Sequence, residues 1–170
     1  MHIAIILWSL FAAWRWGDWK NWKKYHATML FYPFANLVYG LLVNDPDFYL
    51  WRYHGHILLS EETADLFYSI ITFPAVTLVF LSNYPANRFK QFLHITKYVA
   101  IYAVLEFIAH HIGAISYANH WNFLWSIWFN FISFSVIRLH YKKPLLAYTI
   151  SVLITSYLLW HFGVPLKDQE

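Results

Sequence analysis

"FLHITKYVAIYAVLEFIAHHIGAIS", residues 92–116, decides the fold, because its only residues with a fixed-charge side chain are Lys97 and Glu106. A helix of about 20 mostly apolar residues, rising 1.5 Å per residue, crosses the roughly 30 Å hydrocarbon core of a bilayer. This stretch therefore predicts a membrane-spanning helix. It also raises a question, because an acidic side chain near the middle of a span is costly and is a candidate functional group.

The composition of the whole chain agrees with this interpretation. Of the 170 residues, 59% are apolar and 12% are charged, whereas a soluble domain has roughly 25% charged residues. The mean hydropathy is only +0.39, because 10 Trp, 13 Tyr and 10 His lower the average. These residue types are common at membrane interfaces. The absence of Cys excludes disulfide bonds and thiolate metal sites.

Six apolar stretches follow one another along the chain. Their approximate limits are 1–16, 27–43, 63–83, 92–116, 121–139 and 144–163. We therefore expect one all-α domain over residues 1–170, a polytopic integral membrane helical bundle with about six transmembrane helices. Pro33 and Pro74 fall inside two of the spans and predict kinks there.

The basic residues predict the orientation of this bundle. Ten of the 12 Lys and Arg residues lie in or beside alternate connections, the first, third and fifth: Arg15, Lys20, Lys23, Lys24, Arg88, Lys90, Lys97, Arg138, Lys142 and Lys143. Such residues are retained on the cytoplasmic side. Both termini should therefore lie outside, and residues 1–16 should form an uncleaved anchor, since the basic residues follow this apolar run where a signal peptide carries them before it.

The first basic connection, "WRWGDWKNWKKYH" (residues 14–26), interleaves Trp with Lys and Arg. This pattern is typical of an interfacial belt, in which Lys and Arg extend toward the head groups. The lipid bilayer, with anionic lipid at this cytoplasmic belt, is therefore an expected partner. Nucleic acid is not expected, because the basic loops are short.

Three segments carry a resemblance to a known family. They are "AWRWGDWKNWKKYH" (13–26), "ISYANHWN" (115–122) and "RLHYKKPLLAY" (138–148). In these segments the chain resembles a family of small, uncharacterised multispanning membrane proteins from spore-forming Gram-positive bacteria. The resemblance covers essentially the whole chain and implies a helical bundle in the bacterial cytoplasmic membrane. No established activity comes with it.

Polar residues recur at helical spacing within the spans. The fourth span has His94, Tyr98, Tyr102, Glu106 and His110 at every fourth position, where successive side chains are neighbours on a helix. Shorter polar rows in the other spans include Asn36 in the second and Asn130 in the fifth. Because polar groups in a membrane need partners within the protein, these rows should converge on a polar interior.

Glu106 has two interpretations, which the sequence leaves open. It forms a site with His110, Asn36, Asn130 and Tyr102 that opens toward the outer side and binds or transports a small polar solute, a cation or a proton. Alternatively, it is a neutral acid that hydrogen-bonds Asn36, Asn130 or a Tyr. The protein is then a non-catalytic membrane partner or structural protein, in a homo-oligomer or with another membrane protein.

A third interpretation is a metal-dependent membrane enzyme. The predicted topology brings Asp65, His110, His111 and His120 to the outer ends of adjoining helices, and zinc binds such nitrogen and oxygen ligands. A divalent metal is thus a candidate cofactor. Haem is not expected, since the other spans have no His at mid-depth. The sequence lacks HExxH and GxSxG motifs, so it favours a role other than catalysis without deciding the point.

Overall fold

Helices make up most of the chain, as the apolar runs predict. The computed structural model describes residues 1–43, 48–55 and 60–165. Within these residues the α-helices are α1 (His2–Trp16), α2 (His26–Leu42), α3 (Glu61–Phe67), α4 (Phe73–Ser82), α5 (Arg88–His111), α6 (Phe123–Lys142) and α7 (Pro144–His161). The shorter elements are the 3-10 helix η1 (Trp19–Lys24), the π-helix η2 (Tyr68–Thr72) and the strands β1 (Trp51–Tyr53) and β2 (Ile115–Tyr117).

Local capping decides where several helices begin. The side chains of Ser60, Asn87 and Asn122 accept hydrogen bonds from backbone N–H groups in the first turns of α3, α5 and α6, which otherwise lack a partner. α7 begins at Pro144, whose missing N–H costs nothing in a first turn. Each of the six predicted apolar stretches contains a helix, with ends shifted by a few residues.

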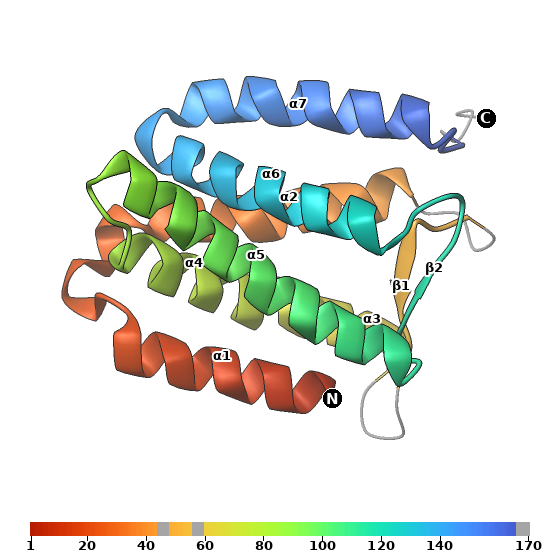
Figure 1. Ribbon diagram of the computed structural model, residues 1–170, viewed down its shortest axis with the longest axis horizontal. Coiled ribbons are helices and arrows are strands. Elements are labelled where there is room, and N and C mark those ends of the chain that lie inside the picture. The colour runs from red at the N-terminus through yellow and green to blue at the C-terminus, as the bar shows by residue number, and fades with distance from the viewer. Residues whose placement is uncertain (44–47, 56–59, 166–170) are drawn as a thin grey trace.

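The helices run up and down the bundle, and Met1 lies at the same end of it as the last turn of α7 (Figure 1). α3, η2 and α4 form one continuous helix, Glu61–Ser82. α4 packs against α1 and α2, while α6 packs against α2, α5 and α7. The connections that carry the basic residues lie at the end opposite the termini, in agreement with the predicted alternation.

Three helices in the described residues are long and apolar enough to cross a membrane, namely Glu61–Ser82, Arg88–His111 and Pro144–His161. α1 is apolar but shorter. α2 has 17 residues, slightly fewer than the roughly 20 that cross the hydrocarbon core. In α7 only 6% of the most apolar window is buried inside the protein, so most of its apolar surface faces outward.

The π-helix η2 ends at Thr72, two residues before Pro74. Proline has no N–H for the carbonyl four residues earlier, and its ring crowds that carbonyl. A wider π turn relieves this crowding, and such turns often mark functional positions. Ser69 and Thr72 of η2 are both buried against neighbouring helices. Pro33 lies inside α2, and the kink predicted there stays a prediction.

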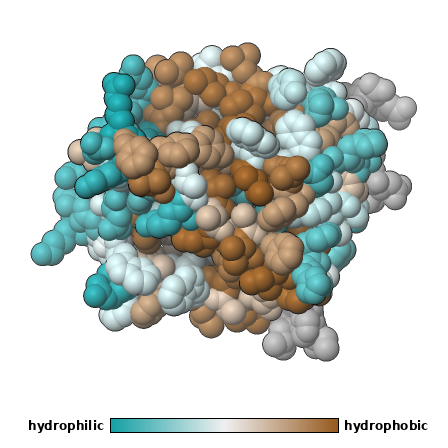
Figure 2. All heavy atoms as spheres, viewed as in Figure 1, coloured by the Kyte–Doolittle hydropathy of each residue, from teal (hydrophilic) through white to brown (hydrophobic). Residues whose placement is uncertain are grey.

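The tightest packing is in the interior between α4, α5 and α6. Leu78, Phe80, Phe134 and Ile137 are at most 1% exposed and belong to one apolar cluster. Many large apolar side chains lie on the outer surface instead, including Leu145 and Trp160 of α7. On the face of the molecule that Figure 2 shows, apolar side chains cover the middle and hydrophilic side chains lie at both ends.

Candidate ligand cavity

A cavity of about 690 Å³ lies inside the bundle. Its wall is built by residues of α1, α2, η2, α4, α5, α6, α7, β1 and β2, and most of them are apolar. Four of the five residues predicted as a ligand site lie on this wall, namely Asn36, Tyr102, Glu106 and Asn130. The polar rows therefore converge on one interior space.

Glu106 is half-buried on the cavity wall and has a partner that the sequence did not predict. The hydroxyl of Tyr117, on β2, donates a hydrogen bond of 2.7 Å to Glu106 Oε1. Burial, followed by this bond and the charge of Glu106, raises the pKa of Tyr117 above its ordinary value. The phenol therefore stays protonated at neutral pH and remains a donor to the carboxylate.

His110, the fifth predicted site residue, lies outside the cavity lining. Its ring is exposed and stacks on Tyr117 with a centroid distance of 4.7 Å. Its Nδ1 lies 3.1 Å from the carbonyl oxygen of Ile115. The expected direct contact between His110 and Glu106 is therefore replaced by an indirect one through Tyr117. The row of every fourth residue winds around the helix, which turns His110 toward β2.

Aromatic rings form the wall near Glu106. Tyr53 stacks on Tyr68 at 5.0 Å between centroids, and Tyr32 stacks on Phe73 at 4.5 Å. Burial raises the pKa of Tyr53 well above its ordinary value, and the charges of Asp65 and Glu106 act in the same direction. Both carboxyl groups are thus close enough to Tyr53 to act on it electrostatically.

Several polar groups on the cavity wall, those of Tyr39, Thr72, Tyr102 and Asn130 among them, have no side-chain partner within the described part of the chain. The hydroxyls of Thr72 and Tyr102 are buried without a hydrogen bond, and Thr72 as a whole is only 4% exposed. Asn130 is 7% exposed, and its amide makes no side-chain hydrogen bond to residues described here. Buried polar groups normally have partners, so these groups are available to a bound molecule.

Asn36 lies on the wall but is engaged elsewhere. Its Nδ2 donates to Asp65 Oδ1 at 3.1 Å and to Ser69 Oγ at 3.0 Å. These bonds join α2 to the helix formed by α3 and η2. Asp65, predicted as a metal ligand at the outer end, therefore serves as an interhelical acceptor.

The other predicted metal ligands do not meet either. His111 is exposed and lies parallel to Phe107, and His120 is exposed with a φ of 66°. In the described ranges no group of three or more His, Asp or Glu residues is placed to hold a metal ion. The loop around His120 carries this side chain to the surface, away from Asp65. Asp45, Asp47 and His56, which the predicted topology also brings to this outer side, lie outside the described residues.

A two-stranded ribbon lies at the end of the bundle that carries the termini (Figure 1). β1 and β2 are antiparallel, with Trp51 opposite Tyr117 and Tyr53 opposite Ile115. Trp51, Tyr53 and Ile115 line the cavity. Side chains alternate between the two faces of a strand, so Arg52 and Ser116 belong to the outer face. The ribbon thus covers one end of the cavity.

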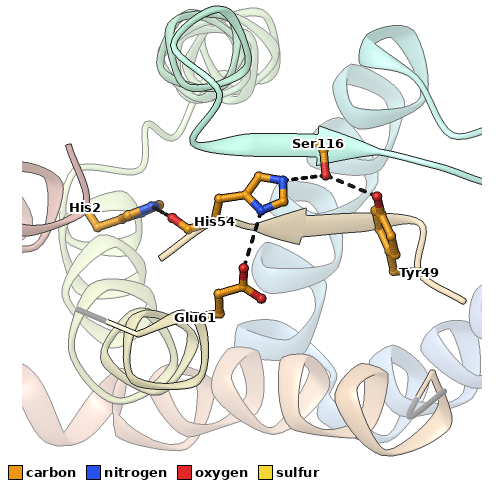
Figure 3. Close-up of polar contacts among 5 residues, drawn as sticks. All are labelled: His2, Tyr49, His54, Glu61 and Ser116. Atoms are coloured by element: carbon orange, nitrogen blue, oxygen red, sulfur yellow. Dashed lines mark hydrogen bonds and ion pairs between the residues drawn. The ribbon is translucent and has the colours of Figure 1, made fainter. Parts of the chain in front are cut away.

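The outer face of the ribbon is attached to the start of α3 (Figure 3). His54 Nε2 lies 2.8 Å from Ser116 Oγ, and His54 Nδ1 lies 3.4 Å from Glu61 Oε1. The order Ser, His, acid is that of hydrolase triads. However, the side chains of His54 and Glu61 are 41% and 45% exposed, so water competes for the longer contact. We assign this cluster to holding the ribbon in place.

A second contact ties the ribbon to the first helix. His2 Nε2 lies 3.2 Å from the carbonyl oxygen of His54, and His2 Nδ1 lies 3.0 Å from the hydroxyl of Tyr68 (the first contact is drawn in Figure 3). The His2 ring is buried and meets the rings of Tyr53 and Tyr68 edge-on. α1, the ribbon and η2 are therefore joined around one buried ring at the covered end of the cavity.

Comparison with known proteins does not indicate a function for this chain. No family model, curated protein or solved structure matches this chain. The resemblance to small multispanning proteins of spore-forming bacteria stays a prediction. The function must therefore be inferred from the cavity and from the groups that line it.

Proposed function

We propose that this protein is a multi-pass protein of the bacterial cytoplasmic membrane that binds or transports a small solute in the cavity beside Glu106. Its helical bundle crosses the membrane six times, once with each of α1, α2, the helix Glu61–Ser82, α5, α6 and α7. Three long apolar helices and the apolar middle of the surface in Figure 2 support this insertion. A soluble monomer rarely exposes apolar patches of that extent.

The distribution of charge supports an orientation with both termini outside. Ten of the 12 basic residues belong to the end of the bundle opposite the termini (Figure 1), and basic loops are retained in the cytoplasm. η1 adds exposed Trp19 and Trp22 beside its lysines. This belt fits the head-group region and favours contact with anionic lipid.

The cavity is the single observation that carries the proposal. Its volume of about 690 Å³ lies within the range of roughly 300–1,000 Å³ typical of small-molecule sites. Interhelical hydrogen bonding alone would surround Glu106 with packed side chains. Glu106 and the unpartnered Asn130 instead border an open interior space.

Two other polar pairs fit the structural interpretation better. Asn36 bonds Asp65 and Ser69, and Thr28 Oγ1 lies 2.9 Å from Nδ1 of the buried His140. Each contact joins two helices and is worth roughly 1 kcal/mol in a membrane. A non-catalytic role in a homo-oligomer or with another membrane protein therefore remains the second candidate, favoured by these contacts and by the exposed apolar face of α7.

Thiol labelling in nanodiscs tests whether water reaches the cavity. The chain has no Cys, so Ser133→Cys and Ser135→Cys each introduce one thiol into α6. Ser133 lines the cavity and Ser135, two residues further on, does not. Iodoacetamide reacts with the thiolate, which forms only where water can reach the sulfur. We expect Ser133→Cys to react and Ser135→Cys to stay unmodified.

The comparison is decisive because both variants exchange a Ser for a Cys in the same helix. Ser135 Oγ donates to the Phe131 carbonyl oxygen at 2.8 Å, so thermal unfolding of both variants is recorded as a control for folding. Equal inertness of the two folded variants would show that water does not enter the cavity, and would reject the proposed function.

A further inference from the structure

The two ends of the cavity differ in charge. Glu106 lines one end, and Lys97, on the same helix, lines the other. Nine residues separate them along α5, which corresponds to about 13.5 Å at 1.5 Å per residue. Between them the wall is mainly apolar, and α5 itself contributes Ile101 and Leu105 alongside Tyr98 and Tyr102. The cavity is therefore acidic at the end covered by the ribbon and apolar along its length.

The acidic end also has aromatic walls. Tyr53 and Tyr102 line this part of the cavity, and the hydroxyl of Tyr102 has no partner within the described residues. The electron-rich faces of such rings attract cations, most strongly where water is excluded. Tyr117 holds Glu106 by its 2.7 Å hydrogen bond, which leaves the second carboxylate oxygen to a ligand. A carboxylate combined with aromatic walls is the chemistry that selects an organic cation.

Other classes of solute fit less well. An anionic group would be repelled by Glu106 at the end covered by the ribbon, so only the opposite end, which Lys97 lines, could accept one. A bare inorganic cation would fill little of about 690 Å³ and would need several oxygen ligands. A sugar-like solute would need a hydrogen-bond partner for each hydroxyl, whereas most of the residues that line the wall are apolar.

We propose that the cavity binds an amphipathic organic cation, with its charged group beside Glu106 and its apolar groups along the apolar wall of α5 and α6. This inference rests on the proposed function and specifies the class of solute. Tyr53 and Tyr102 flank the charged group. The apolar groups displace water from the apolar wall, which adds affinity in proportion to the apolar area buried.

Two probes of the same shape and opposite charge test the inference. Tetraphenylphosphonium is a lipophilic cation, and tetraphenylborate is the matching anion. Their binding is measured by equilibrium dialysis against protein in phosphatidylcholine nanodiscs, with empty nanodiscs subtracted. We expect saturable binding of the cation only. Glu106→Gln should weaken it by about tenfold or more, because one buried charged contact is lost.

Two further variants control for folding and for unspecific charge effects. Glu62→Gln removes an exposed carboxylate at the start of α3 and should leave binding of the cation unchanged. Asn130→Asp keeps the size of the side chain and adds a second carboxylate to the wall, so it should tighten binding. Glu106→Gln removes a negative charge from the wall, whereas Asn130→Asp adds one. The Asn130→Asp variant therefore tests the preference for a cation even if the Glu106→Gln variant does not fold.

Each outcome separates the inference from the proposed function. Equal binding of the two probes, or a folded Glu106→Gln variant that binds the cation as tightly as the parent protein, would overturn the inference. No binding of tetraphenylphosphonium by a protein whose Ser133→Cys variant reacts with iodoacetamide would also overturn the inference and leave the proposed function in place. If the protein does not bind tetraphenylphosphonium and its Ser133→Cys variant does not react with iodoacetamide, the proposed function itself is rejected.

Discussion

Removing the hydrogen bond between Tyr117 and Glu106 should have a small effect on stability. The bond is short, at 2.7 Å, but both side chains are half-buried. Polar contacts measured inside membrane proteins average about 0.6 kcal/mol and reach about 1.7 kcal/mol. Tyr117→Phe should therefore lower the free energy of unfolding by about 0.6–1.7 kcal/mol.

Two substitutions of Glu106 separate its functional role from a structural one. Glu106→Gln keeps an acceptor oxygen for Tyr117 and should cost less than about 0.5 kcal/mol, whereas Glu106→Leu leaves the hydroxyl without a partner and should cost about 1–3 kcal/mol. If Glu106 binds solute, the Gln variant is stable and loses binding. If Glu106 only joins the ribbon to α5, the Gln variant is stable and fully active.

The free energies come from reversible unfolding in mixed micelles, followed by tryptophan fluorescence. A double-mutant cycle of Tyr117→Phe and Glu106→Leu isolates the coupling between the two side chains. We expect a coupling of about 0.6–1.7 kcal/mol. A coupling indistinguishable from zero would refute the contact, and a Gln variant that keeps full solute binding would refute the role of its charge.

Two other predictions concern packing and topology. A Cβ added at Gly17 would collide with the carbonyl oxygen of Ala13 and would lie 2.9 Å from Leu78 Cδ2, so Gly17→Ala should destabilise the fold by about 1–3 kcal/mol. Gly40→Ala, with nothing within 4 Å, should stabilise α2 by about 0.5–1 kcal/mol, and equal unfolding midpoints for the two variants would contradict this packing. In intact cells, an impermeant maleimide should label Cys in place of Glu62 and miss Cys in place of Asn87, and the reverse pattern would invert the proposed orientation.

The helices could be predicted because a span has a simple requirement, a long apolar run. The predicted fourth span begins at residue 92, whereas the helix α5 begins earlier, at Arg88. Apolar content marks the hydrocarbon core, whereas the cap formed by Asn87 decides where the helix begins. The π turn before Pro74 was not predicted, because a proline inside a span indicates a distortion without specifying its form.

The sequence predicts those cavity residues that recur at helical spacing. Tyr102 and Glu106 are one turn apart on α5, and this regularity needs no knowledge of the rest of the fold. The role of Tyr117 was missed, although the alternation in Ile115, Ser116 and Tyr117 is a weak strand signal. A strand of three residues is specified mainly by its distant partner, here β1, so the sequence alone could not place His110 either.

The ribbon also imposes an order on synthesis. β1 cannot pair with β2 until α3, α4 and α5 have been made, because all three lie between the strands in the chain. Chains fold from the N-terminal side as they emerge, so the contact of Asn36 with Asp65 is available well before that of Tyr117 with Glu106. The nascent protein therefore presents Glu106 to its surroundings without a cover, and β2, α6 and α7, which are made after α5, complete the enclosure.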